Sequence, residues 1–116
     1  QTPWSVSAPS VAALVACLQP GVGAESLSRA HQLRGWAAAL ETGLRERGVE
    51  VVPSAAPYVL ARVGDGVHAA LRDAGIAVRR ADTFPGLDSS WVRIAARPVA
   101  MTELLLDALD RLGVRA

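Results

Sequence analysis

The chain has 116 residues, enough for one domain with a hydrophobic core and no disulfides, and 51% of its residues are hydrophobic. All twelve basic residues are arginine, the net charge is only +1, and the aromatic residues are three Trp, one Tyr and one Phe, which argues against nucleic-acid binding. With no run of about 18 apolar residues and no positively charged leader, we expect a cytoplasmic protein without a membrane partner.

Residues 1–48 are predicted to be a helical segment. Ser7 can cap a first helix, which tolerates Pro9 because amides in the first turn lack intrahelical partners. Residues 19–23 are predicted to break the helix before a second one over residues 25–47. The apolar faces of these helices are broad, so we expect a partner outside the chain to cover them.

Two side chains in these helices have alternative interpretations. Cys17 is the single cysteine, so it forms no disulfide within the chain, and its place among Ala, Val and Leu favours a buried hydrophobic role. Trp36 falls in helical register with other apolar residues, which favours a core or interface position over a ligand platform.

Residues 49–116 are predicted to form an α+β domain. We expect strands over residues 49–52, 58–63 and 76–80, a strand from Trp91, and a short helix over residues 66–74 that Asp65 caps. The last helix is the clearest, because its apolar residues recur at i, i+3, i+4, i+7, i+8 and i+11: Met101, Leu104, Leu105, Ala108, Leu109 and Leu112. This order favours a small antiparallel or mixed sheet of about three to four strands covered by helices, with a long broken N-terminal helix. Because the chain starts at Gln1, we expect a piece of a longer protein.

Arg93 is the residue that most needs an explanation, because it stands among apolar residues in the middle of a predicted strand. Side chains alternate along a strand, so Trp91 and Ala95 share its side, while Val92 and Ile94 point to the other. One interpretation is an arginine exposed on a half-covered sheet. The other is an anion receptor, since a guanidinium matches a carboxylate or phosphate in two parallel hydrogen bonds.

Arg79, at the end of the preceding predicted strand, is the second candidate. Adjacent strands lie about 5 Å apart, so Arg79 and Arg93 could converge on one dianion. The alternative is structural ion pairing with Asp82 or Asp88. Further arginines that could lie nearby are Arg62, Arg80 and Arg97.

The chain contains no complete catalytic or metal-binding motif. Residues 21–23 lack the third glycine and the preceding strand of a phosphate-binding loop, and no serine lies in Gly-x-Ser-x-Gly. His31 and His68 fall on different helices, so we expect no metal site.

Three separated blocks carry a family resemblance. Residues 53–60 (PSAAPYVL), 71–79 (LRDAGIAVR) and 91–95 (WVRIA) resemble, in order and spacing, the C-terminal small domain of pyridoxal-phosphate enzymes of the class I/II aminotransferase family. Within that family, the chain most resembles the branch of histidinol-phosphate aminotransferases and threonine-phosphate decarboxylases, from about Trp4 to Leu112. The family often has Asn-Phe where this chain has Pro57-Tyr58.

The resemblance implies roles for the two arginines and for the missing parts of the protein. By it, Arg93 matches the arginine that holds the substrate carboxylate, and Arg79 matches one that helps to hold the substrate phosphate. The family uses pyridoxal phosphate on a lysine of a larger upstream domain, and this chain has no lysine. The resemblance therefore implies a small domain that is not catalytic alone, with residues 1–48 linking it to a missing large domain. The complete enzyme is expected to hold pyridoxal phosphate, to form a homodimer and to act on a phosphorylated amino acid or amine.

Within this branch, the loop Phe84-Pro85-Gly86-Leu87 resembles that of threonine-phosphate decarboxylases. We therefore expect a threonine-phosphate decarboxylase-like enzyme of cobalamin biosynthesis. A histidinol-phosphate aminotransferase small domain is the alternative. Two alternatives of other classes are a stand-alone anion-binding regulatory module and a structural domain whose helices pack on a partner.

Overall fold

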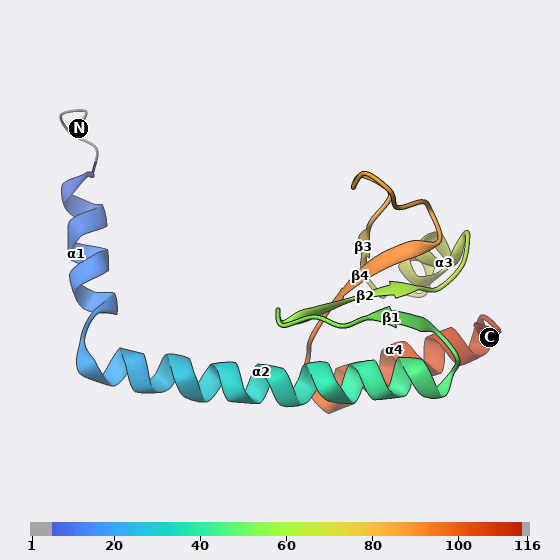
Figure 1. Cartoon of the computed structure of the whole chain (residues 1–116), viewed down its shortest axis with the longest axis horizontal. Coiled ribbons are helices and arrows are strands. Elements are labelled where there is room, and N and C mark those ends of the chain that lie inside the picture. The colour runs from blue at the N-terminus through green and yellow to red at the C-terminus, as the bar shows by residue number, and fades with distance from the viewer. Residues whose placement is uncertain (1–5, 115–116) are drawn as a thin grey trace. The chain divides into compact units, whose positions relative to one another are not determined.

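The computed structural model describes residues 6–114, and the chain divides into two compact units, Gln1–Gln32 and Leu33–Ala116. The elements follow one another along the chain (Figure 1) as α1 (Ala8–Cys17), α2 (Pro20–Glu46), β1 (Glu50–Val52), β2 (Tyr58–Arg62), α3 (Val67–Asp73), β3 (Arg79–Arg80), β4 (Trp91–Ala95) and α4 (Val99–Arg111). The second unit therefore begins inside α2.

The strands form one four-stranded sheet with the order β1-β2-β4-β3. Each neighbouring pair is antiparallel, so the predicted α+β class is confirmed and the sheet is antiparallel rather than mixed. β2 and β4 are the central strands, and each has a hydrogen-bonded partner on both sides. In β4, Val92 and Ile94 are buried while Trp91 and Arg93 are only partly buried, which confirms the predicted alternation.

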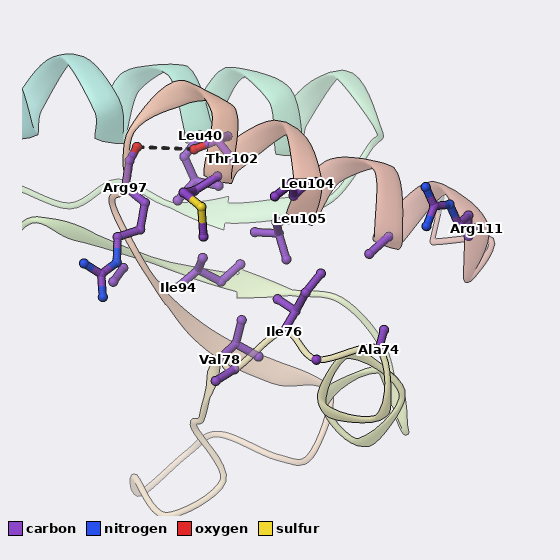
Figure 2. A pocket seen from close by; sticks show the side chains of 15 residues that line it. Leu40, Ala74, Ile76, Val78, Ile94, Arg97, Thr102, Leu104, Leu105 and Arg111 are labelled. Atoms are coloured by element: carbon purple, nitrogen blue, oxygen red, sulfur yellow. Dashed lines mark hydrogen bonds between the residues drawn. The ribbon is translucent and has the colours of Figure 1, made fainter.

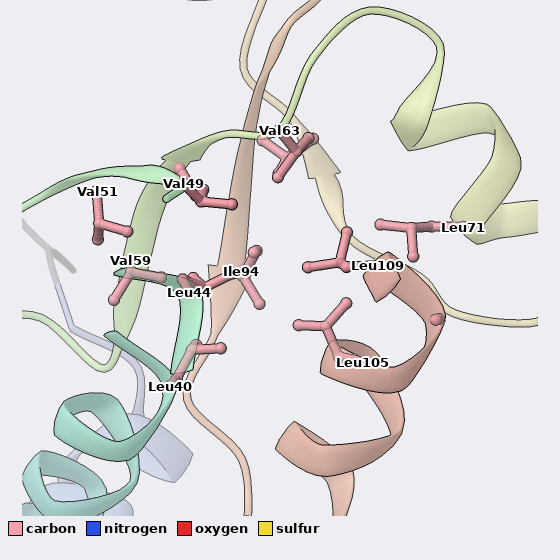
Figure 3. Close-up of a cluster of buried hydrophobic side chains, with 13 residues drawn as sticks. Leu40, Leu44, Val49, Val51, Val59, Val63, Leu71, Ile94, Leu105 and Leu109 are labelled. Carbon is pink, nitrogen blue, oxygen red and sulfur yellow. The ribbon is translucent and has the colours of Figure 1, made fainter. Parts of the chain in front are cut away.

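One side of the sheet packs against α4 and the C-terminal part of α2 (Figure 3). Leu44 of α2 and Leu109 of α4 are both 0% exposed, so both helices bury apolar side chains in the core beneath the sheet. Gly43 marks where the two helices approach most tightly, because a Cβ atom at that position would meet the side chain of Leu106. The apolar period predicted for the last helix places Leu105 and Leu109 inside, whereas Leu104 remains 58% exposed.

Several local predictions were wrong for identifiable reasons. The predicted break occurs between α1 and α2, with a bend of 71°, but at residues 18–19 rather than 19–23, because α2 already begins at Pro20 and proline is tolerated in a first turn. Asp65 does not cap α3: Gly66 stands at the N-cap with φ 77° and no side-chain cap, and Asp65 accepts a hydrogen bond from Ser89 instead. The strand predicted over residues 76–80 shortens to Arg79–Arg80.

Residues 6–32 contain no buried side chain. Cys17 is exposed, contrary to the predicted burial, and its helix α1 has no buried residue. The exposed apolar side chains of this segment are Val6, Val11, Leu14, Val15, Leu18, Val22 and Leu27. By length and composition, no single helix of residues 6–114 could cross a membrane, although the bent pair of α1 and α2 could. The cytoplasmic location stays a prediction.

Candidate functional site

The two arginines singled out from the sequence lie side by side on the sheet. Arg79 of β3 and Arg93 of β4 are direct cross-strand partners. Directly opposite residues have Cβ atoms about 4.5–5.5 Å apart and project to the same face. That face is the one turned away from the core, because Val92 and Ile94 occupy the other. We call it the open face. Its described positions include Tyr58, Leu60, Arg62, Arg79, Trp91, Arg93 and Ala95.

Neither arginine is neutralised by a carboxylate. Among residues 6–114, no ion pair involves Arg79 or Arg93. Asp82, an expected alternative partner, pairs with Arg80 instead, at 2.9 Å from the Arg80 terminal nitrogen. Hydrogen bonds to Asp82 raise the pKa of the Arg80 guanidinium above its ordinary value. Arg80 is therefore paired with Asp82, whereas no carboxylate of residues 6–114 pairs with Arg79 or Arg93.

Asp88, the other expected partner, belongs to the loop that leads into β4. It accepts hydrogen bonds from the Ser90 hydroxyl and from the Ser90 backbone N–H, the latter at 3.0 Å. These bonds, helped by the positive charge of Arg62, hold the pKa of Asp88 below its ordinary value. Arg62 in turn donates to the Ser90 hydroxyl at 3.3 Å and lies 3.8 Å from a Glu50 carboxylate oxygen. This network occupies Arg62 and anchors the loop before β4.

Arg93 contacts the aromatic ring of Tyr58. Its guanidinium carbon lies 4.7 Å from the centroid of the Tyr58 ring, within the range of a cation–π interaction. Sequence reasoning named Tyr58 only as a departure from the usual family residues. Alternation places it on the same side as Leu60, but the contact with Arg93 depends on the β2–β4 register, which the sequence does not show.

The open face presents two guanidinium groups without a carboxylate partner in residues 6–114, which is an arrangement that suits an anion. Like charges directly opposite in a sheet cost roughly 0.2–1 kcal/mol, and an anion between Arg79 and Arg93 would remove that cost. Among the described residues, no group of three or more His, Cys, Asp and Glu side chains could hold a metal ion. The arrangement fits a carboxylate, a phosphate or one of each.

A separate cavity of about 550 Å³ lies on the helix-covered side of the sheet (Figure 2). Its walls come from α4, the end of β4 and the segment before β3, with Ile94 and Leu105 among the lining side chains. Arg97 lines this cavity, and neither Arg79 nor Arg93 does. No sequence signal pointed to it, because its lining residues come from segments far apart in the chain.

Comparisons with known proteins agree on the family. The family model described as Aminotransferase class I and II matches residues 1–112. A histidinol-phosphate aminotransferase of Mycobacterium tuberculosis is 41% identical over 97 residues, which are 82% of this chain and 27% of that relative. The chain thus spans about a quarter of the length of this curated relative.

Two solved structures show the same fold. The histidinol-phosphate aminotransferase from Clostridium acetobutylicum is 28% identical with a TM-score of 0.76, over 97% of this chain and 35% of that one. The L-threonine-O-3-phosphate decarboxylase from Porphyromonas gingivalis is 30% identical with a TM-score of 0.69, over 94% of this chain and 34% of that one. The sheet, the helices that cover it and the match over nearly the whole sequence lead to one conclusion: the chain belongs to the class I and II aminotransferase family.

Proposed function

We propose that this chain is the substrate-anchoring C-terminal domain of a pyridoxal-phosphate-dependent enzyme, a threonine-phosphate decarboxylase-like enzyme of cobalamin biosynthesis. In this proposal Arg93 holds the substrate carboxylate and Arg79 helps to hold the substrate phosphate. The observation that carries it is the direct pairing of these two arginines across β3 and β4 without a carboxylate partner in the described residues. Two adjacent cationic groups suit a substrate with two anionic groups.

The chemistry of the substrates favours the decarboxylase over the aminotransferase. Threonine phosphate carries a carboxylate and a phosphate on one molecule, one for each arginine, whereas histidinol phosphate carries only the phosphate and the aminotransferase meets a carboxylate on its second substrate, 2-oxoglutarate. Decarboxylation also requires the bond to the carboxylate to be held in one orientation. Arg93 suits that task because β4 is a central strand with hydrogen-bonded partners on both sides, β2 and β3. Arg79 lies on the short edge strand.

The residues of this chain do not fit covalent attachment of pyridoxal phosphate. The cofactor acts as an electron sink when a protein lysine holds it, and this sequence contains no lysine. We therefore assign binding and orientation of the substrate to this chain, and the cofactor site to the large domain outside it. Borohydride reduction of the 116-residue chain with pyridoxal phosphate should label no side chain, and a stable adduct at any position other than the N-terminal α-amine would contradict this assignment.

The large domain is also the partner that we propose for residues 1–48, and the complete enzyme is proposed to be a homodimer. Residues 6–32 bury no side chain within the chain, although Leu14 is 56% and Leu18 is 80% exposed. Monomeric proteins rarely leave such a row of apolar side chains uncovered. The curated relative is nearly four times as long as the matched segment, so most of its length remains to provide the cover.

A histidinol-phosphate aminotransferase is the second candidate, because the relative that is 41% identical bears that name. The deciding experiment uses the full-length enzyme with two substrates in parallel. Carbon dioxide release from threonine phosphate supports the decarboxylase. Loss of the amine from histidinol phosphate that depends on 2-oxoglutarate, with no carbon dioxide from threonine phosphate, would overturn it in favour of the aminotransferase.

Variants of the complete enzyme test the roles of the arginines. If Arg93 forms a desolvated bidentate pair with a carboxylate, Arg93→Ala should cost about 2–5 kcal/mol, or roughly 30-fold to several thousand-fold in kcat/KM. Arg93→Lys should recover only part, because an ammonium group cannot make the bidentate contact. Arg80→Ala is the matched control, since Arg80 is already paired with Asp82. Wild-type kinetics in Arg93→Ala would place Arg93 among ordinary surface arginines.

A further inference from the structure

Tyr58 and Arg93 are diagonal neighbours on the open face. Tyr58 lies directly across from Ala95, and Arg93 lies directly across from Leu60. Diagonal positions are about 7–8 Å apart, which aromatic and long side chains can span. The small side chain of Ala95 leaves the space across from the ring to Arg93, whose guanidinium carbon lies 4.7 Å from the ring centroid. A cation is attracted to the face of an aromatic ring at distances up to about 6 Å.

The Tyr58 ring restrains the Arg93 side chain, which has few other contacts in the described part of the chain. Within residues 6–114, the Arg93 guanidinium makes neither a hydrogen bond nor an ion pair, and its direct neighbour on the other side is the like-charged Arg79. A flexible arginine loses rotamer freedom when it binds an anion, and that loss lowers its affinity. A guanidinium already held against a ring has lost part of this freedom before the anion arrives.

Tyr58 is itself well placed to act as a fixed platform. It is the first residue of β2, and the preceding Pro57 carbonyl accepts a hydrogen bond from the Ala96 backbone N–H at 2.9 Å. Tyr58 is 37% exposed and lies outside the buried core cluster. Removal of its ring should therefore leave the core intact and act on the open face alone.

We propose that Tyr58 is a positioning residue that orients the Arg93 guanidinium toward the substrate carboxylate. The inference rests on the proposed role of Arg93 in carboxylate binding. Tyr58 acts through Arg93, so its loss weakens recognition of the carboxylate while recognition of the phosphate remains. Because the ring face provides the attraction, the phenolic hydroxyl is dispensable.

The test compares Tyr58→Leu, which keeps apolar bulk but removes the ring, with Tyr58→Phe, which keeps the ring. In the full-length enzyme, Tyr58→Leu should weaken binding of threonine phosphate about 3- to 30-fold, and Tyr58→Phe should stay within about twofold of wild type. Binding of 1-amino-2-propanol phosphate, which is threonine phosphate without its carboxylate, should not change in either variant. In an Arg93→Ala background, Tyr58→Leu should have no further effect.

The outcomes separate this inference from the function on which it rests. If Arg93→Ala weakens threonine phosphate binding but Tyr58→Leu does not, the positioning role is wrong and the role of Arg93 stands. Equal weakening for both ligands in Tyr58→Leu would assign the ring a general structural role and overturn the inference. If Arg93→Ala itself has no effect on the carboxylate ligand, both assignments are wrong. Should the enzyme prove to be an aminotransferase, the same comparison uses glutamate as the carboxylate ligand and histidinol phosphate as the ligand without one.

Discussion

Neutralising Arg79 should change stability and anion binding in opposite directions. Arg79 and Arg93 are direct cross-strand partners without a carboxylate partner in the described residues, so the unliganded sheet carries two like charges on opposite positions of one face. Substituting Arg79→Gln keeps a long polar side chain and removes one of the charges. The variant should be more stable than wild type in the absence of anions, and it should bind phosphate more weakly.

The expected magnitude follows from the cross-strand geometry. If the two charges lay as close as the paired Cβ atoms, about 5 Å, they would repel by about 0.8 kcal/mol in a water-like dielectric; a longer separation gives less, so this value is an upper limit. Screening with a Debye length of about 8 Å at physiological salt reduces this to roughly 0.4 kcal/mol. Urea unfolding of the 116-residue chain should therefore show Arg79→Gln gaining at most about 0.4–0.8 kcal/mol at low salt, and almost nothing at about 1 M salt.

Arg34→Gln is the matched control, because Arg34 is exposed on α2 and no ion pair within residues 6–114 involves it. It should leave the urea midpoint nearly unchanged. Added phosphate should raise the midpoint of wild type more than that of Arg79→Gln at equal ionic strength. A loss of stability in Arg79→Gln at low salt, or equal stabilisation of both proteins by phosphate, would refute the paired-arginine site.

Three further substitutions or reactions test other parts of the structure. Arg47→Ala should lower the free energy of unfolding by about 1–3 kcal/mol, measured with urea, because Arg47 donates to both carboxylate oxygens of Asp110 at 2.9 and 2.7 Å. Asp88→Asn should lower the free energy of unfolding near neutral pH and have less effect in acid. The hydrogen bonds from Ser90 lower the pKa of Asp88 in the folded protein. Wild type therefore loses the stability that the Asp88 carboxylate contributes as the pH falls from about 4 through this lowered pKa. Cys17 should react quickly with a maleimide in the 116-residue chain and slowly in the full-length enzyme, if the large domain covers α1.

The Arg47→Ala prediction has a control in the last turn of α2, just before Arg47. Arg45→Ala removes the ion pair that the exposed Arg45 makes with the partly buried Glu41 one turn earlier in α2, and should cost less than about 0.5 kcal/mol. If Arg47→Ala and Arg45→Ala lower the free energy of unfolding equally, the pair between Arg47 and Asp110 of α4 contributes no more than an ion pair within α2. An unchanged maleimide rate for Cys17 in the full-length enzyme would contradict the proposed cover of residues 1–48.

The sequence alone determined those features that depend on spacing along the chain. Alternation in β4 placed Arg93 and Trp91 on the face opposite Val92 and Ile94, because side chains of a strand point to the two faces in turn. The apolar period of α4 placed Leu105, Ala108 and Leu109 in the core, but Met101, Leu104 and Leu112 of the same period are exposed. The sequence contains no lysine side chain, and the order of its predicted helices and strands indicated the α+β fold.

Only the tertiary structure decided which residues meet across the chain. Strand order and register made Arg79 the direct partner of Arg93 and brought the Tyr58 ring against the Arg93 guanidinium. A shift of one residue in the register would have sent these side chains to the other face of the sheet. Competition for partners decided the rest. Asp82 paired with Arg80, and Asp65 bonded Ser89 rather than the helix after it. Local spacing does not encode such choices, because they depend on groups that folding brings close from distant parts of the sequence.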